Sequence, residues 1–588
     1  MRYLNYYFIL LIISFLILEI FFRHSRFIEF SSTFSFFYFL SFLFELTFFY
    51  ICIRLINIQK RHPLKISLTL AVFISFIQLI NYSHYSYFGI FPNTFSILFL
   101  FDNFTQSVEI LLSTISILHL LAFLFLITLY FALIKKMLKT SSFIQNKFLI
   151  GIIVTFFLIL TLVINNNLKR HPAAFSSLTS SFFQTVYTAD QILTGEVEEK
   201  RELFPLRHIS FPKVKKSNPD FNLLLLIGES VRNKKIPETS KTATPFLDSL
   251  VNNKSVIKFN NYFANGNSTV NTLFNILAGK LSGINSSSVL IYDIVKNYTN
   301  SHTFFISPQE FYHNHSDQFY NKNLDKFLCY EKMDYDDFNG ISLNDFDVVK
   351  SFKDHLDTLS SKFMGIIQFN NTHHPYTEFL NTNRFNSNKK MINKYLNCLY
   401  EHDLLIKDYF DYLSSKKLLE STVIIYVSDH GEAFDEHKHS GHLTTIYNEQ
   451  VNVPLWVYLP EKFKNEKQNL LKNKDLNFSH LDIFPTILDL YNINDNFQTN
   501  FPKRKSFFGQ SKNDRIIPMK GTDMLPCYGF VKDSLKFINS GKTEGEKISA
   551  FNFKEDPEEK INIFRKLSSK EQKNAHAILD SIKKLIQF

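Results

Sequence analysis

The sequence predicts a chain of two unlike halves, an α-helical membrane domain followed by an α/β domain. Up to about residue 167 the chain is rich in Phe, Leu and Ile and poor in charge, whereas from Lys169 onward it is polar and rich in Lys and Asn. In the second half, short apolar runs alternate with helical patterns, which is typical of a mostly parallel sheet. The length of 588 residues also exceeds one ordinary core. We expect a membrane domain over residues 1–167, a connector over 168–220 and an α/β domain over 221–588.

Five apolar stretches in the first half are long enough to cross a bilayer, which takes about 20 helical residues. They lie near residues 3–22, 33–53, 64–82, 112–134 and 148–165. The first is a retained helix rather than a signal peptide, because no small-residue cleavage site follows Phe22 and four more stretches come after it.

The loops between these stretches differ in charge. Lys and Arg collect in the second connection, at residues 54–65, and in the fourth, at 135–147, whereas the long third connection has neither. The positive-inside rule places both basic loops in the cytoplasm, with Arg23 and Arg26 of the first loop as a minor exception. The second half should therefore lie outside the cytoplasm, in the periplasm of a bacterium.

Three ionisable residues, Glu19, Glu45 and His119, lie inside predicted spans. Such groups are costly in a membrane, so they serve either a function or hydrogen bonding between helices, and both interpretations stay open. The connector has an amphipathic stretch near Phe182 to Leu193, which we expect to lie along the membrane surface.

The net charge of +10 does not indicate nucleic-acid binding, because the Lys residues are scattered rather than massed in one motif. The four Cys residues form no CxxC pair and no zinc-finger spacing. Only Cys329, Cys398 and Cys527 lie in the second half, so at most one disulfide can form there.

Three apolar runs of the second half end in polar motifs, and the carboxyl ends of parallel strands share one edge of a sheet, where ligands bind. The runs and their motifs are Leu223–Ile227 with Gly228-Glu229-Ser230, Met364–Phe369 with Asn371-Thr372-His373-His374-Pro375, and Val423–Val427 with Ser428-Asp429-His430-Gly431-Glu432. Glu229, Asp429 and His430 are oxygen and nitrogen ligands suited to Zn²⁺. Each alone has a structural explanation, such as a helix cap or a core histidine, but together they indicate a metal site.

A candidate nucleophile lies in the segment Asn265–Thr272. It follows a strand-like run, Val256 to Phe263, and opens an apolar helix, Val270 to Leu277. A hydroxyl at a helix start is well placed for a phosphate group. Ser268, Thr269 and Thr272 compete for this role, and simple N-capping is the alternative.

The chain resembles the membrane-anchored phosphoethanolamine transferases of the alkaline-phosphatase/sulfatase superfamily, which modify lipid A and core oligosaccharide and include polymyxin-resistance enzymes. The resemblance covers nearly the whole chain and is carried by Leu226–Ser230, Thr244–Leu247, Asn265–Thr272, Ser428–Glu432, Gly441-His442, Ser479–Thr486 and Phe553–Lys560. It implies a sulfatase/alkaline-phosphatase-like fold for the α/β domain. It also implies zinc ligands at Glu229, Asp429 and His430, a zinc-bound threonine nucleophile at Thr269 and two further site histidines, His373 and His442.

By this resemblance the chain would be a zinc enzyme of the bacterial inner membrane with its catalytic domain in the periplasm. It would transfer phosphoethanolamine from phosphatidylethanolamine to lipopolysaccharide, at lipid A or a core sugar, or to another envelope glycan, through a phospho-threonine intermediate. Two positions depart from the family pattern and bear on the identity of the acceptor. Asn265 and Asn275 stand where relatives of the lipid A type often have a disulfide. No CxPxR-type motif surrounds Thr269, so sulfate ester hydrolysis is not expected.

Two alternatives stay open. One is a phosphoglycerol transferase of the lipoteichoic-acid-synthase type, with a similar anchor and metal site but a phosphatidylglycerol donor. The other is a non-catalytic envelope scaffold, against which the intact set of Glu229, Thr269, Asp429 and His430 speaks. The number of zinc ions and the oligomeric state have no signal in the sequence.

The topology can be tested with reporter fusions. An alkaline-phosphatase reporter is active only outside the cytoplasm, so we expect activity when it is fused after Asn166 and none when it is fused after Lys136. A silent fusion at Asn166 would contradict the predicted location of the second half.

Overall fold

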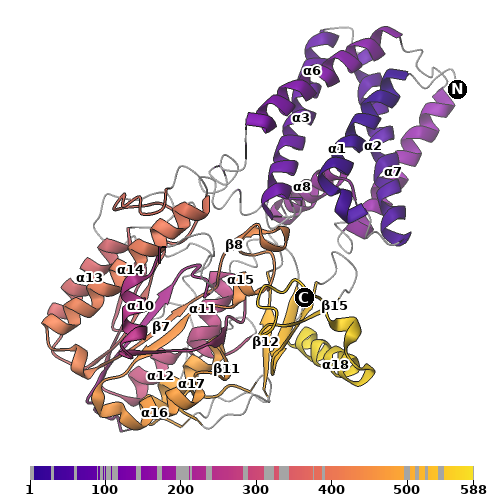
Figure 1. Ribbon diagram of the computed structural model, residues 1–588. Helices are drawn as coiled ribbons and strands as arrows, with labels where there is room; N and C mark the ends of the chain where they lie inside the picture. Colours follow the sequence, from indigo (N-terminus) through magenta and orange to yellow (C-terminus); the bar gives the residue numbers. More distant parts are fainter. Residues whose placement is uncertain are drawn as a thin grey trace. The chain divides into compact units, whose positions relative to one another are not determined.

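The computed structural model contains a helical unit and an α/β unit, which are described separately (Figure 1). The first lies within Met1–Val197, and the second within Glu198–Gly541 and Lys547–Phe588. The structure describes residues 6–27, 32–58, 62–88, 117–140, 147–168, 175–193, 211, 215–233, 241–281, 289–309, 324–329, 344–374, 376–386, 391–494, 503–509, 515–522, 527–540 and 548–586, with a few single positions between 91 and 115.

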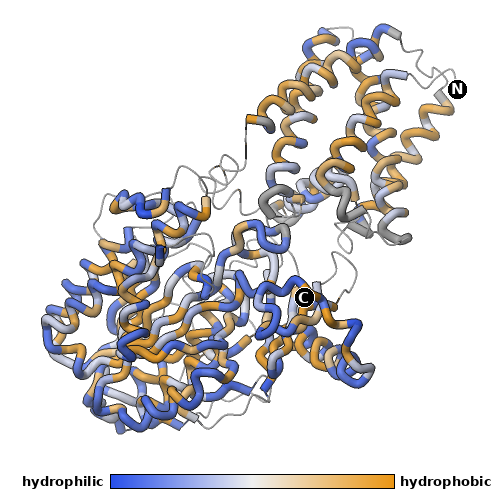
Figure 2. The backbone as a smooth tube through the Cα atoms, in the orientation of Figure 1, coloured by the Kyte–Doolittle hydropathy of each residue, from blue (hydrophilic) through white to orange (hydrophobic). Residues whose placement is uncertain are grey.

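The helical unit is built from long apolar helices. They are α1 (Tyr6–Phe27), α2 (Ser32–Ile58), α3 (Pro63–Phe88), α6 (Ile117–Thr140) and α7 (Lys147–Leu168), followed by α8 (Ser177–Leu193). Figure 2 shows that hydrophobic residues dominate these helices along their length. Their shared core includes Phe15, Phe49 and Tyr130, and many apolar side chains on their outer surfaces are exposed, as expected in lipid.

The number of spans differs from the prediction of five. Among the described residues, four helices are long and apolar enough to cross a membrane: Ser35–Ile58, Pro63–Tyr85, His119–Lys139 and Phe148–Asn165. The described apolar part of α1, Tyr6–Phe22, is shorter than 18 residues. The predicted side of the α/β unit does not depend on α1, since it follows from the basic loop at 135–147 and the crossing of α7.

Several predictions lie wholly or partly outside the described residues. These concern the third connection, the start of the fourth span before residue 117, the loop at 141–146 and most of the connector between 194 and 214.

The α/β unit is organised by a seven-stranded sheet. In spatial order its strands are β2 (Val256–Lys258), β10 (Leu455–Tyr458), β7 (Thr422–Ser428), β1 (Asn222–Gly228), β6 (Phe363–Gln368), β4 (His302–Ile306) and β5 (Lys326–Leu328). The pairs of β1 with β6 and β7, and of β4 with β5 and β6, are parallel, and β10 is antiparallel to both of its neighbours. This confirms the predicted mostly parallel sheet.

Helices cover both faces of this sheet, so its central strands are apolar on both sides. In β1, Leu223, Leu225 and Ile227 join one core, and Leu224 and Leu226 join the other. The first core includes residues of α11 (Thr269–Ala278), α12 (Ile291–Tyr298), α16 (Lys464–Asn473) and α17 (Ile483–Leu490), and the second those of α10 (Pro245–Asn252), α13 (Asp345–Asp357) and α14 (Met391–Ser415).

The predicted single strand over Val256 to Phe263 is wrong, because two short strands occupy it. β2 joins the main sheet, and β3 (Asn261–Phe263) pairs with β11 (Asn477–Ser479). The chain changes partners between them: the N–H of Phe259 donates to Leu455 O, and the N–H of Asn260 donates to Lys474 O.

A second, antiparallel sheet follows near the carboxyl end. Its strands are β12 (Ile516–Lys520), β13 (Tyr528–Lys532), β14 (Leu535–Asn539) and β15 (Ile548–Asn552), and α18 (Ser569–Ile586) packs on β13. Three small elements complete the unit: β8 (Ala433–Phe434), β9 (Ser440–Gly441) and α15 (Asn448–Val451).

A buried ion pair joins Lys536 of β14 in this second sheet to Glu559, which also contacts the loop between β8 and β9. Lys536 Nζ lies 3.0 Å from Glu559 Oε1, and both side chains are fully buried. Glu559 also accepts the N–H of Asn448 at 2.7 Å through Oε2, and its carbonyl oxygen lies 3.2 Å from His437 Nε2. Removing one partner of such a pair leaves an uncompensated charge in the interior.

Glu559→Ala should therefore lower the free energy of unfolding of the α/β unit by about 3–5 kcal/mol. The single tryptophan, Trp456, is buried in β10, so its fluorescence during denaturation reports on this unit. Glu558→Ala is the matched control, because Glu558 pairs with Lys560 at the surface and its removal should leave the unfolding curve nearly unchanged. Equal curves for both variants would contradict the role of the pair.

Candidate functional site

The structure brings the predicted motifs together at the carboxyl end of the central strands. Gly228 pairs with Ser428 at the last position of the parallel β1–β7 ladder, so Glu229 and Asp429 leave the sheet side by side. The N–H of Asp429 donates to Gly228 O at 2.9 Å, which extends the ladder by one bond. The register of two strands thus places two carboxylates next to each other.

Glu229, Asp429 and His430 form a compact buried group with ligand atoms within 4.8 Å of one another. His430 Nε2 lies 3.4 Å from Glu229 Oε1 and 3.4 Å from Asp429 Oδ2. One oxygen of Asp429, Oδ1, accepts the N–H groups of Ser230 at 3.0 Å and His430 at 2.6 Å. The other oxygen, Oδ2, is buried and accepts no hydrogen bond from the described residues.

The charges of this group fit a bound cation. Burial, together with the charge of Asp429, raises the pKa of Glu229 well above its usual value. Among the described residues, no Lys or Arg forms an ion pair with either carboxylate. Burial lowers the pKa of His430, which favours the neutral imidazole that metals bind. Two carboxylates and one imidazole, with an unused buried oxygen, suit Zn²⁺.

Thr269 is the first residue of α11, and its hydroxyl lies against this group. Thr269 Oγ1 is 3.2 Å from Glu229 Oε2 and 3.3 Å from His430 Nε2. Thr272, a competing candidate, donates its hydroxyl within the helix to the carbonyl oxygens of Ser268 at 2.8 Å and Thr269 at 3.2 Å. Ser268 is the N-cap residue of α11, although its side chain makes no cap hydrogen bond. Of the three hydroxyls, that of Thr269 has the described contacts with the carboxylate and imidazole group.

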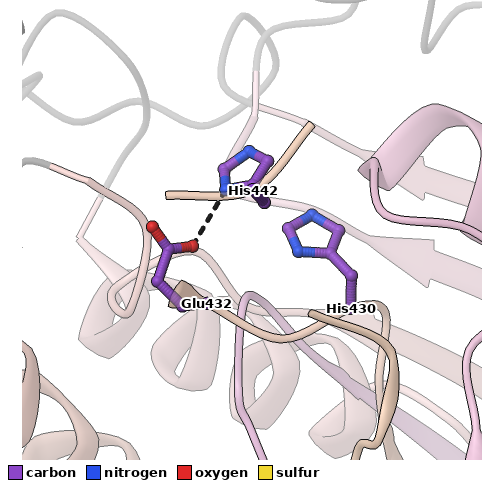
Figure 3. A group of neighbouring side chains, drawn as sticks. All are labelled: His430, Glu432 and His442. Carbon is purple, nitrogen blue, oxygen red and sulfur yellow. Dashed lines mark hydrogen bonds and ion pairs between the residues drawn. The ribbon is translucent and has the colours of Figure 1, made fainter. Parts of the chain in front are cut away.

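The two predicted site histidines lie beside the same group. The ring of His442 is 4.3 Å from that of His430 and 5.5 Å from that of His373, measured between centroids. Glu432 accepts a hydrogen bond from His442 Nδ1 at 2.9 Å, as Figure 3 shows with His430 alongside, and another from the Tyr376 hydroxyl at 2.8 Å.

Glu432 is a site residue to which the sequence prediction gave no role, although it ends the motif Ser428–Glu432. With His430 and His442 it forms a second group of potential metal ligands. Such a carboxylate also fixes the orientation of an imidazole and stabilises its protonated form.

The two histidines differ in protonation. Burial, followed by the neighbouring His442, lowers the pKa of His373 to about 3. Burial also lowers the pKa of His442, but Glu432 outweighs it and the net shift is upward. The pKa of Glu432 falls to about 2, because its contacts with His442 outweigh the effect of burial. These shifts favour the protonated form of His442 and the neutral form of His373.

A buried polar clamp joins the Thr269 segment to the His442 segment. The N–H of Leu443 donates to Asn267 O at 3.1 Å, and Asn267 Nδ2 donates to Thr445 O at 2.7 Å. Gln450 completes the clamp: its Oε1 accepts the N–H of Thr445 at 3.2 Å, and its Nε2 donates to Thr444 Oγ1 at 2.9 Å. Gln450 is fully buried and lies far from Asn267 in sequence, so nothing in the chain pattern indicated it.

Asp345 supports the segment that carries His373. Its carboxylate accepts the N–H groups of Asn370 and Asn371, each at 2.8 Å to Oδ2. Burial raises the pKa of Asp345 to about 7, although these two bonds oppose the shift. Thr372 in turn donates its hydroxyl to Glu229 O, which links the segment to the end of β1. The sequence prediction did not include Asp345.

The four cysteines, all of which the structure describes, are free thiols. At the start of the Asn265–Thr272 segment, Asn265 Nδ2 donates to Pro518 O at 2.7 Å, and Asn265 Oδ1 accepts the N–H of Leu481 at 3.3 Å. Asn275 Nδ2 donates to Lys280 O at 2.7 Å. Hydrogen bonds thus hold Asn265 and Asn275, the two positions at which relatives of the lipid A type often have a disulfide.

The segment that carries this site matches a known protein family. Residues 221–493 match the protein-family model described as Sulfatase. The segment contains all six predicted site residues, Glu229, Thr269, His373, Asp429, His430 and His442.

Solved structures that resemble the chain include three bacterial proteins. The C-terminal periplasmic domain of EcEptC from Escherichia coli, in complex with Zn, is 18% identical with a TM-score of 0.44 and covers 53% of this chain and 94% of its own. The integral membrane protein lipooligosaccharide phosphoethanolamine transferase A (EptA) from Neisseria meningitidis is 16% identical, with a TM-score of 0.48 and coverage of 76% and 87%. The lipoteichoic acid synthase LtaP from Listeria monocytogenes is 16% identical, with a TM-score of 0.46 and coverage of 66% and 96%.

The match of residues 221–493 and the parallel sheet with its site at the carboxyl edge agree with the predicted fold class. The α/β unit contains a sulfatase-like domain at residues 221–493, and it is preceded by a helical unit in which the described residues form four candidate membrane spans.

Proposed function

We propose that this chain is a zinc-dependent transferase that moves phosphoethanolamine from phosphatidylethanolamine to lipopolysaccharide, at lipid A or a core sugar, or to another envelope glycan. It would act in the bacterial inner membrane with its α/β unit in the periplasm. The observation that carries the proposal is the contact of the Thr269 hydroxyl with both Glu229 and His430, in a group of buried ligands. A hydroxyl in that position is a nucleophile rather than a helix cap.

Glu229, Asp429, His430 and the Thr269 hydroxyl would hold the metal ion. When bound, Zn²⁺ lowers the pKa of a hydroxyl that contacts it and offsets negative charge on a phosphate. The chain itself positions the hydroxyl, since Thr269 begins α11 and the Asn267 clamp fixes the preceding turn.

In the first half of the reaction the Thr269 oxygen, whose proton has passed to water before the donor reacts, forms a bond to the phosphorus of phosphatidylethanolamine. The bond between phosphorus and the diacylglycerol oxygen breaks. That oxygen takes a proton from His442, whose protonated form Glu432 stabilises, and diacylglycerol leaves as an alcohol. Phosphoethanolamine is then bound covalently to Thr269.

In the second half an acceptor oxygen attacks the same phosphorus and the bond to Thr269 breaks. His442, now neutral, takes the acceptor's proton, so both groups return to their starting state. His373 lies 5.5 Å from His442 between ring centroids and, as a neutral imidazole, is suited to accept a hydrogen bond from the acceptor.

The helical unit is consistent with a lipid donor, because four candidate spans confine the chain to the surface where such lipids lie. The donor's own phosphodiester supplies the transferred group, so turnover needs no nucleotide.

The deciding experiment incubates the purified full chain in vesicles with either labelled phosphatidylethanolamine or labelled phosphatidylglycerol. We expect label on Thr269 and released diacylglycerol with the first lipid. Labelling by phosphatidylglycerol alone would indicate the phosphoglycerol transferase, and labelling by neither a scaffold.

Thr269→Ala should abolish transfer, with a loss of at least about 1,000-fold, because the covalent step has no other nucleophile. The α/β unit should stay folded, since Ser268 rather than Thr269 is the N-cap of α11. Thr272→Val is the matched control: it removes a neighbouring hydroxyl that bonds only within the helix and should retain activity. Transfer activity and Trp456 fluorescence are measured for both. The reverse pattern would assign the nucleophile to another hydroxyl.

Asp429→Asn should lower both zinc content and activity, because a neutral amide is a weaker ligand than a carboxylate. Zinc content is measured by elemental analysis of the purified chain. Asp408→Asn serves as the control, since Asp408 pairs with Lys353 at the surface and its zinc content should equal that of the parent. Full zinc content in Asp429→Asn would remove Asp429 from the ligand set.

A further inference from the structure

Helix α8 (Ser177–Leu193) has apolar side chains on its exposed face and mostly polar side chains on its buried face. The residues that face outward form an apolar stripe of Phe182, Val186, Ala189 and Leu193, and the side chains of Phe182, Val186 and Leu193 are 44%, 51% and 87% exposed. The residues that face inward are mostly polar and buried: Ser177, Thr179, Ser180, Gln184 and Thr188. A surface helix of a water-soluble domain has the opposite arrangement.

Two carboxylates of the membrane helices hold the buried polar face. Glu19 in α1 accepts the N–H of Ser177 at 2.6 Å. Glu45 in α2 accepts the hydroxyls of Ser176 and Thr179, the latter at 3.1 Å, and both bonds are made to Oε1. Carboxylates at the start of a helix stabilise its unpaired N–H groups and the positive end of its dipole.

A third membrane helix contributes an amide. Asn81 in α3 donates through Nδ2 to Ser177 O at 3.2 Å, and its Oδ1 accepts the hydroxyl of Ser181 at 2.7 Å. Three helices of the bundle thus converge on the first turn of α8, which lies at one end of the helical unit (Figure 1). This number of specific bonds indicates a built docking site.

The apolar stripe continues the apolar surface of the bundle. The Phe182 ring lies 5.9 Å from Phe44 and 6.0 Å from Phe48, both within the candidate span Ser35–Ile58. Polar residues occur only at the edges of the stripe: Thr185, whose hydroxyl donates to Ser181 O at 2.8 Å, and Asp190. An apolar stripe with polar edges is typical of helices at the boundary between acyl chains and headgroups.

We propose that α8 is a lipid-contacting helix of the membrane unit, docked through its polar face on Glu19, Glu45 and Asn81, with the stripe of Phe182, Val186, Ala189 and Leu193 against acyl chains. Acyl chains are the occupant because the stripe has no charge and adjoins a span whose outer residues are also apolar. The two intramembrane glutamates then hold the start of α8 on the bundle.

Spin labels on the full chain test the contact with lipid. Labels are placed at Val186→Cys or Leu193→Cys in a Cys52→Ser background, in vesicles of phosphatidylethanolamine and phosphatidylglycerol. We expect frequent collision with oxygen, which dissolves in acyl chains, and rare collision with a water-soluble nickel chelate. Ile561→Cys is the matched control, because this exposed apolar residue of the α/β unit should meet the nickel chelate freely. Access of nickel to positions 186 and 193 would overturn the proposal, and so would exclusion of both reagents, which would mean that protein covers the stripe.

A second pair of variants tests the docking site. Glu45→Ala removes the oxygen that Ser176 and Thr179 share, so the label at position 186 should become more mobile. Glu45→Gln retains an oxygen at the place of Oε1 and should restore most of the ordering. Unchanged mobility in Glu45→Ala would overturn the docking role, whereas the lipid test on the parent chain is independent of whether this variant folds.

Discussion

The site depends on two carboxylates that the parallel pairing of β1 with β7 forces together. The Gly228–Ser428 register brings Glu229 and Asp429 side by side in the interior, and no polar group of the described residues satisfies Asp429 Oδ2. The close approach of the surrounding chain requires glycine at Gly228, where a Cβ would lie 2.4 Å from the Tyr426 hydroxyl. Because two adjacent buried negative charges repel each other, the arrangement is stable only with protons or a cation between them.

Thr269 and the histidines are held to this pair by polar side chains outside the predicted ligand set. Asn267 and Gln450 join the Thr269 segment to the His442 segment, and Asp345 fixes the turn that carries His373. Each of these residues is buried and bonds backbone groups, so each acts on the geometry of the site rather than on a substrate. A small displacement of a reacting group costs much of its rate, which explains why so many buried polar side chains surround one threonine.

The sequence predicted the parts of the site that depend on local pattern. Glu229, His373 and Asp429 lie within four residues of the ends of apolar runs, and strand ends converge in any parallel sheet. The supports could not be predicted, because Gln450 and Asp345 bond segments far along the chain and neither lies in a distinctive motif. The change of sheet at Phe259 could not be predicted for the same reason. β2 and β3 pair with strands near residues 456 and 478, and no local residue type marks the change of partner.

Buried acids elsewhere in the chain show how unusual the pair at the site is. Asp403 accepts the N–H groups of Phe246 and Leu247, Asp345 accepts those of Asn370 and Asn371, and Glu559 pairs with Lys536. In the helical unit Glu19 and Glu45 receive the start of α8. In each case the chain supplies donors or a positive charge to the carboxylate. At Glu229 and Asp429 it supplies neither in full, since Asp429 Oδ2 accepts no hydrogen bond from the described residues. The pair therefore fits a positive charge from outside the chain, and the Thr269 hydroxyl lies where it would share that charge.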